Sequence, residues 1–215
     1  MKRLAIIVFA LLIVFSTIQV FSASPGHFYA GYFYYNSEGW PPPGGVKGDI
    51  CTIDKPVPQG QFYCQWVIVI LKYRPLYWIQ VGYGKSPDTQ YKLRSYVEKQ
   101  DVNGYDIQYF SFRYQGNTYT YWASKDLSSG VWICGSNDWS YYLGVLNPNS
   151  ARDYQAFSET TVFTINIDGT HFMNICYKLG SDWQLWDRHV VRQDYPYWVS
   201  EVSNYEFYAG GGGYG

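Results

Sequence analysis

A carboxylate, Glu159, stands within a stretch whose pattern is otherwise that of a buried strand. With a period of two, residues 157–167 place Phe163 and Ile165 on the same face as Glu159. A carboxylate on an inward face costs free energy unless it has a partner, and residues that break a pattern in this way are often functional. Alternatively, Glu159 lies at a wet strand end or pairs with an arginine such as Arg152.

A glutamine, Gln80, holds a similar place on a second predicted strand, residues 77–83. Gln80 shares a face with Trp78 and with Gly82, which leaves room beside it for a backbone or a ligand. An amide beside a carboxylate is a workable hydrolytic pair, because the carboxylate can activate water and the amide N–H can stabilise an oxyanion. Alternatively, Gln80 is a solvated residue on an edge strand.

The elements that must position these two residues are strands. They are predicted at residues 66–71, 77–83, 91–98, 106–114, 118–123, 157–167, 170–177 and 205–208. Asp168-Gly169 predicts a hairpin turn between 157–167 and 170–177. Turn signals every ~8–12 residues without helical periodicity predict an all-β protein, an antiparallel two-sheet β-sandwich. Aromatic residues make up 21% of the chain, with 24 Tyr and 9 Trp. This surplus predicts a sheet face lined by them; alternatively, it reflects only the general preference of strands for aromatic residues.

Four short motifs then occur in an order and spacing that resemble a known family. They are Trp66-Val67-Ile68-Val69, Trp78-Ile79-Gln80-Val81-Gly82-Tyr83, Tyr96-Val97-Glu98 and Ser158-Glu159-Thr160-Thr161-Val162-Phe163. This set resembles the glutamic peptidases (eqolisins) and the wider concanavalin A-like jelly-roll proteins. It has a more distant similarity to neprosin-type peptidases.

The resemblance implies a concanavalin-like jelly roll and an activity. Gln80 and Glu159 would form the catalytic dyad of a secreted glutamic-type endopeptidase that cleaves polypeptides at acidic pH. The substrate-binding residues implied in the same way are Trp66, Trp78, Tyr96 and Glu98. The stretch after Trp66 is Val69-Ile70-Leu71, where the family has an aspartate.

Other classes of function stay open beside the peptidase. One is a non-catalytic module whose Tyr and Trp face binds a carbohydrate, such as a polysaccharide, or another polymer. Another is an extracellular structural or filament subunit, which the aromatic composition would tolerate. A glycosidase would use paired carboxylates, either Glu159 with Glu98 or Glu201 with Glu206.

The N-terminus predicts export and a single domain. Lys2 and Arg3 precede an apolar run at residues 4–15 that is short for a membrane span. We therefore expect a signal peptide at residues 1–22, one β-sandwich domain at 23–209 and a flexible Gly-rich tail at 210–215. The protein would be secreted, with no membrane association after cleavage; an uncleaved N-terminal anchor is the alternative.

Four cysteines in an exported chain predict two disulfides. Three pairings are allowed, and the sequence proximity of Cys51 and Cys64 favours that pair, with Cys134 joined to Cys176. We expect no metal site and no cofactor, because CxxC is absent and the three histidines are scattered. A net charge of -1 gives no basis for a nucleic-acid partner.

Overall fold

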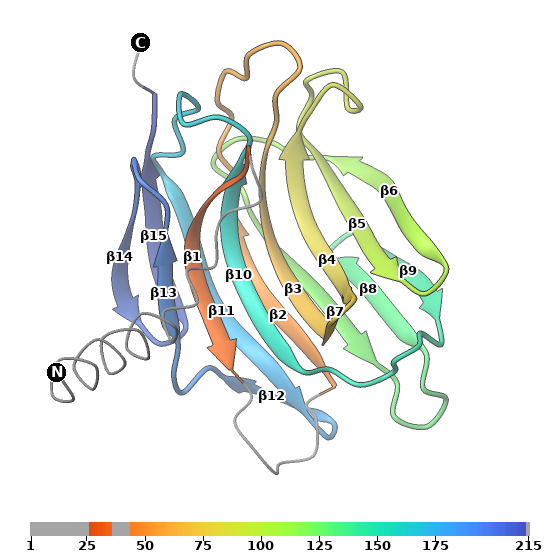
Figure 1. Cartoon of the computed structure of the whole chain (residues 1–215). Coiled ribbons are helices and arrows are strands. Elements are labelled where there is room, and N and C mark those ends of the chain that lie inside the picture. Colours follow the sequence, from red (N-terminus) through yellow and green to blue (C-terminus); the bar gives the residue numbers. More distant parts are fainter. Residues whose placement is uncertain (1–25, 36–43, 214–215) are drawn as a thin grey trace, which may run out of the picture.

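The computed structural model describes residues 26–35 and 44–213 as two stacked antiparallel sheets (Figure 1). Two strands, β12 and β13, are of only four residues, and the longest, β3, has eleven. The described residues contain no helix of the length and apolarity that a membrane span needs. The predicted signal peptide at residues 1–22 lies outside the described part of the chain.

The seven-stranded sheet carries the strands on which the chemistry was predicted. Its order is β13 (Val190–Gln193), β1 (Phe28–Tyr35), β10 (Asp153–Thr160), β3 (Tyr63–Tyr73), β4 (Leu76–Lys85), β5 (Arg94–Asp101) and β6 (Gly104–Phe112). The eight-stranded sheet lies behind it in Figure 1. Its path, in order, is β14 (Tyr197–Ser203), β15 (Glu206–Gly211), β11 (Thr170–Leu179), β2 (Gly45–Cys51), β7 (Thr118–Lys125), β8 (Trp132–Ser136) and β9 (Trp139–Gly144), with β12 (Asp182–Leu185) paired to β11.

Both faces of the seven-stranded sheet are apolar, which explains the continuous hydrophobic run in β3. Val67, Val69 and Leu71 point inward into the core between the sheets. Trp66 and Ile68 point outward and belong to a second hydrophobic cluster on the opposite face. A strand buried on both faces shows no alternation of polar and apolar residues, so β3 reads as one apolar run.

The long strand predicted at residues 157–167 is wrong in its second half. The strand β10 ends at Thr160, and the chain then crosses to the other sheet, where Ile165 and Ile167 are buried in the core. The Asp168-Gly169 turn therefore leads into β11, whose partners are β2, β12 and β15 rather than β10. Phe163 within the crossover is half exposed, whereas Ile165 and Ile167 are buried without belonging to a strand, so apolar residues at a spacing of two do not by themselves indicate a strand.

The predicted Gly-rich tail is also wrong at its first two residues. Gly210 and Gly211 pair with Trp198 and Tyr197 as the end of β15. The Gly211 N–H donates to the Asp168 carboxylate at 2.7 Å, and this bond lowers the pKa of Asp168. A side chain at Gly210 would overlap the Trp198 ring, so glycine here permits close packing in the sheet.

The two predicted disulfides are wrong, because all four cysteines are free thiols. Cys51 ends β2 in one sheet, whereas Cys64 lies on the outer face of the other. Cys134 is enclosed in the core, and the Cys176 thiol donates to the Asn174 carbonyl at 3.1 Å. An even count in an exported chain favours disulfides, but it does not fix which faces the strands present.

Candidate active site

A groove of about 840 Å³ runs across the outer face of the seven-stranded sheet. Strand pairing builds its floor in rows, because residues in register share a face. One row is Gln155, Ile68, Gln80 and Glu98, from β10, β3, β4 and β5. Phe157 and Trp66 form the next row on this face, and Glu159 and Cys64 form the row after that. The predicted carboxylate and amide therefore face the same groove.

Glu159 is almost fully buried, with 7% of its surface exposed, and its carboxylate has three partners. His27 Nδ1 lies 2.5 Å from Oε1, and Trp66 Nε1 donates to Oε2 at 2.8 Å. The Cys64 thiol also approaches Oε2, at 3.7 Å. Arg152 is not a partner; its Nε lies 3.7 Å from the Asp153 carboxylate. The buried charge is therefore compensated by neighbours from β3 and from the segment before β1.

His27 is a residue of the site that no sequence pattern indicates. It precedes β1 by one position and lies 132 residues from Glu159. The hydrogen bond to Glu159 raises the pKa of His27, burial opposes this, and the charges of Glu159 and Glu98 add to the increase. The ring of His27 therefore keeps its proton to higher pH than a free imidazole does. The His27 ring also packs edge-on against the Phe62 ring, with 5.6 Å between the ring centroids.

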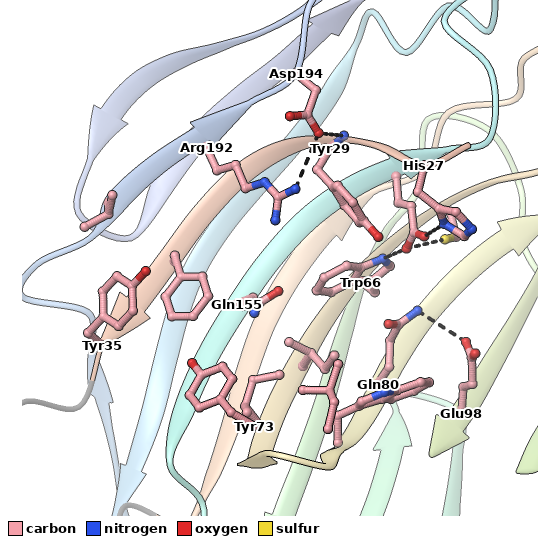
Figure 2. A pocket seen from close by; sticks show the side chains of 18 of the residues that line it. His27, Tyr29, Tyr35, Trp66, Tyr73, Gln80, Glu98, Gln155, Arg192 and Asp194 are labelled. Carbon is pink, nitrogen blue, oxygen red and sulfur yellow. Dashed lines mark hydrogen bonds and ion pairs between the residues drawn. The ribbon is translucent and has the colours of Figure 1, made fainter. Parts of the chain in front are cut away.

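Gln80 is held from β5 through its amide nitrogen. Nε2 donates to the Tyr96 hydroxyl at 2.6 Å and lies 3.4 Å from Glu98 Oε2 (Figure 2). Tyr96, which stands opposite Gly82 in the β4–β5 register, is buried and does not line the groove. Gly82, two residues along β4, permits a close backbone approach, because a Cβ there would overlap the Gln65 carbonyl and stand 2.8 Å from the Trp66 Cα.

Glu98 is the second carboxyl group of the groove, and its environment differs from that of Glu159. Burial raises the pKa of Glu98 to about 7. A hydrogen bond from Tyr105 and the charge of His27 lower it, while the charge of Glu159 raises it further. Glu98 is thus a neutral carboxylic acid under acidic conditions.

The structure brings five of the six predicted residues to the wall or floor of this groove. They are Trp66, Trp78, Gln80, Glu98 and Glu159. Tyr96, the sixth, does not line the groove but packs in the same cluster as Trp66 and accepts a hydrogen bond from Gln80. The groove is further walled by aromatic residues from β1, β3 and β6, namely Tyr29, Phe33, Tyr35, Tyr73 and Tyr105. The predicted aromatic face is therefore the outer face of the seven-stranded sheet.

No protein-family model and no curated protein matches the sequence. Solved structures do match the fold. Scytalido-glutamic peptidase with a peptide-based transition state analog superposes with a TM-score of 0.60 at 9% identity, covering 86% of this chain and 97% of that one. SCP-B, a member of the eqolisin family of peptidases in complex with the tripeptide Ala-Ile-His, gives 0.54 at 8% identity over the same shares. The predicted eqolisin-like antiparallel sandwich is confirmed.

Proposed function

We propose that this chain is a glutamic-type endopeptidase that hydrolyses polypeptides at acidic pH. The observation that carries the proposal is the common groove of Glu159 and Gln80 on the outer face of an eqolisin-like sandwich. A carboxylate and an amide that face one solvent-accessible groove supply a general base and an oxyanion donor. On the basis of the apolar N-terminal segment, we place the enzyme outside the cell.

In the first step, Glu159 removes a proton from a water molecule while the water oxygen attacks the carbonyl carbon of the scissile peptide. The carbonyl oxygen becomes an oxyanion and accepts a hydrogen bond from Gln80 Nε2. In the second step, the C–N bond breaks, and the proton held by Glu159 passes to the leaving amine. The indole of Trp66 keeps one oxygen of Glu159 fixed, so the carboxylate needs no reorientation between the two transfers.

Acidic conditions suit this arrangement because of Glu98. The Gln80 amide already points toward Glu98 at 3.4 Å, so an ionised Glu98 would compete for the proton that the oxyanion needs. It would also place a negative charge beside the developing oxyanion. Below the pKa of about 7, Glu98 is neutral and both effects weaken.

The test uses the full chain and an unfolded protein as substrate, with fragments identified by mass spectrometry between pH 3 and pH 7. We expect Gln80→Ala and Glu159→Gln each to lower the cleavage rate by about 100- to 1,000-fold. The matched controls are Gln108→Ala on the exposed side of β6 and Glu201→Gln on β14, which both lie away from the groove. Both controls should cleave at the wild-type rate.

A polysaccharide-binding module is the second candidate, since aromatic side chains wall the groove and their rings can stack on sugars. If wild-type protein cleaves no peptide bond anywhere in this pH range but binds a polysaccharide, the endopeptidase proposal fails. Loss of that binding in Trp66→Ala or Trp78→Ala would then assign the groove to carbohydrate.

A further inference from the structure

The groove continues past the proposed catalytic residues toward the β1–β13 edge of the sheet. Its floor there is Phe33, Ile68 and Gln155, and its wall includes Arg192 on β13. Figure 2 shows Arg192 and Gln155 on the side of Trp66 that is remote from Glu98, with Tyr29 near both Arg192 and His27. This half of the groove takes no part in the steps described above.

Arg192 lies over the groove because the residue opposite it in β1 is a glycine. In the β1–β13 register it stands opposite Gly31, and Gly31 stands opposite Phe157 in β10. A Cβ at Gly31 would overlap the Ala156 carbonyl and the Phe157 ring, so no side chain can separate Arg192 from the groove floor. The guanidinium lies over the Tyr29 ring, with Cζ 4.6 Å from the ring centroid. This stacking fixes the direction of the side chain.

The hydrogen-bonding capacity of Arg192 is largely unused. Its Nη2 forms an ion pair with Asp194 Oδ2 at 3.7 Å, too long for a hydrogen bond, and Asp194 Oδ2 already accepts the Tyr29 N–H at 2.9 Å. Nη2 of Arg192 is buried and has no hydrogen-bond partner within residues 26–35 and 44–213. A buried guanidinium donor without an acceptor costs free energy, which a ligand oxygen would recover.

Gln155 offers a second polar group on the same stretch of floor. Its neighbours across the two adjacent strands are Phe33 and Ile68, both apolar. Among the described residues, no side chain or backbone group makes a hydrogen bond with its amide. An amide between apolar neighbours and an under-used guanidinium on the wall of the same half of the groove match a ligand that carries oxygen acceptors.

We propose that Arg192 and Gln155 form a subsite that binds a carboxylate of the polypeptide substrate. This inference rests on the proposed function and names its substrate class: peptides with an acidic group a few residues from the scissile bond. A planar guanidinium pairs with a carboxylate through two parallel N–H donors, and the Gln155 amide adds a third. The carboxylate has two sources, a Glu or Asp side chain or the free C-terminus of a short peptide.

The experiment uses the full chain and peptides built around one cleavage site found in the unfolded protein substrate. Each flanking position in turn carries Glu, Gln or Lys, and each peptide is made with a free and with an amidated C-terminus. At pH 5, where a Glu side chain is mostly ionised, we expect one position at which Glu exceeds Gln in kcat/KM by about tenfold or more. If the free C-terminus carries the effect instead, amidation removes it whatever the internal residue.

Arg192→Met keeps an aliphatic stem over Tyr29 but removes the charge, so the Glu-to-Gln ratio should fall to about one. Arg192→Lys should restore part of the ratio, because the charge returns without the planar fork. Arg188→Met, outside the groove, is the matched control and should keep the wild-type ratio. Circular dichroism of each variant verifies the fold.

A wild-type ratio near one at every position and at the C-terminus overturns the subsite, as does an unchanged ratio in Arg192→Met. If no peptide is cleaved at all, the proposed function fails, and binding then tests the subsite alone. Titration of the Glu159→Gln protein with the Glu and Gln peptides should show tighter binding of the Glu peptide, lost with Arg192→Met. Equal affinities would refute the subsite independently of catalysis.

Discussion

Replacing Glu98 by glutamine tests the electrostatics of the groove without relying on activity. The variant keeps the size of the side chain and an oxygen that accepts from Tyr105, but it cannot ionise. In the wild type, burial raises the pKa of Glu98 from 4.5 to about 7. The folded state therefore binds this proton more tightly than the unfolded state does.

The sign and size of the effect on stability follow from this difference. Below pH 4.5 both states are protonated, and Glu98 contributes no pH dependence. As pH rises from 4.5 to 7, the unfolded chain releases the proton first, so the free energy of unfolding of the wild type falls. At ~1.4 kcal/mol per pKa unit the loss is about 3 kcal/mol, and we take about 2–3 kcal/mol because the carboxyl is only partly buried.

The measurement is denaturant unfolding followed by tryptophan fluorescence at pH 4 and pH 8. The difference in stability between the two pH values should be about 2–3 kcal/mol smaller in Glu98→Gln than in the wild type. Asp182→Asn, an exposed change on β12, should leave the wild-type difference intact. Equal differences in wild type and Glu98→Gln would refute the assignment of Glu98 as a buried neutral acid. In peptidase assays the same variant should stay active at higher pH than the wild type.

Three further outcomes are expected. His27→Gln removes the cation beside Glu159. Because the pKa of His27 is raised, the variant should be less stable than the wild type by on the order of 1 kcal/mol at pH 5 and equally stable at pH 9, where the imidazole is neutral. Equal destabilisation at both pH values would contradict the ion pair. Gly82→Ala should destabilise the fold by about 1–3 kcal/mol in thermal or urea unfolding, whereas Gly44→Ala, where a Cβ meets only ordinary contacts, should not. Thiol titration of the denatured, unreduced protein should count four reactive cysteines; two or none would show that disulfides form.

The part of the site that the sequence predicts is the part that strand geometry dictates. Gln80 lies in the interior of β4, and Glu159 lies one residue before the end of β10. Successive side chains of a strand point to opposite faces, so the face of each of these two follows from its position in the sequence. Once both strands join the same sheet, the two side chains meet in one groove. Glu98 follows in the same way, because it stands opposite Gln80 in the β4–β5 register.

The parts that the sequence does not predict depend on contacts between distant segments. His27 precedes β1, and no pattern around it signals that β1 pairs with β10 and carries the ring to Glu159. Arg192 reaches the groove because β13 adds to the sheet edge next to Gly31. The prediction of two disulfides fails because the number of cysteines does not determine which sheet each one joins.

The two glutamates of the groove differ in what their neighbours offer. Glu159 accepts hydrogen bonds from Trp66 and pairs with His27, two donors suited to a carboxylate. Glu98 has a hydroxyl donor in Tyr105 and a long contact to Gln80, and burial dominates. In the proposed mechanism Glu159 takes up and returns the proton, while Glu98 takes no proton from the substrate and acts only through the charge it places next to Gln80. The apolar residues of the outer face surround both groups, and a low local dielectric strengthens the effect of the Glu98 charge on its neighbours.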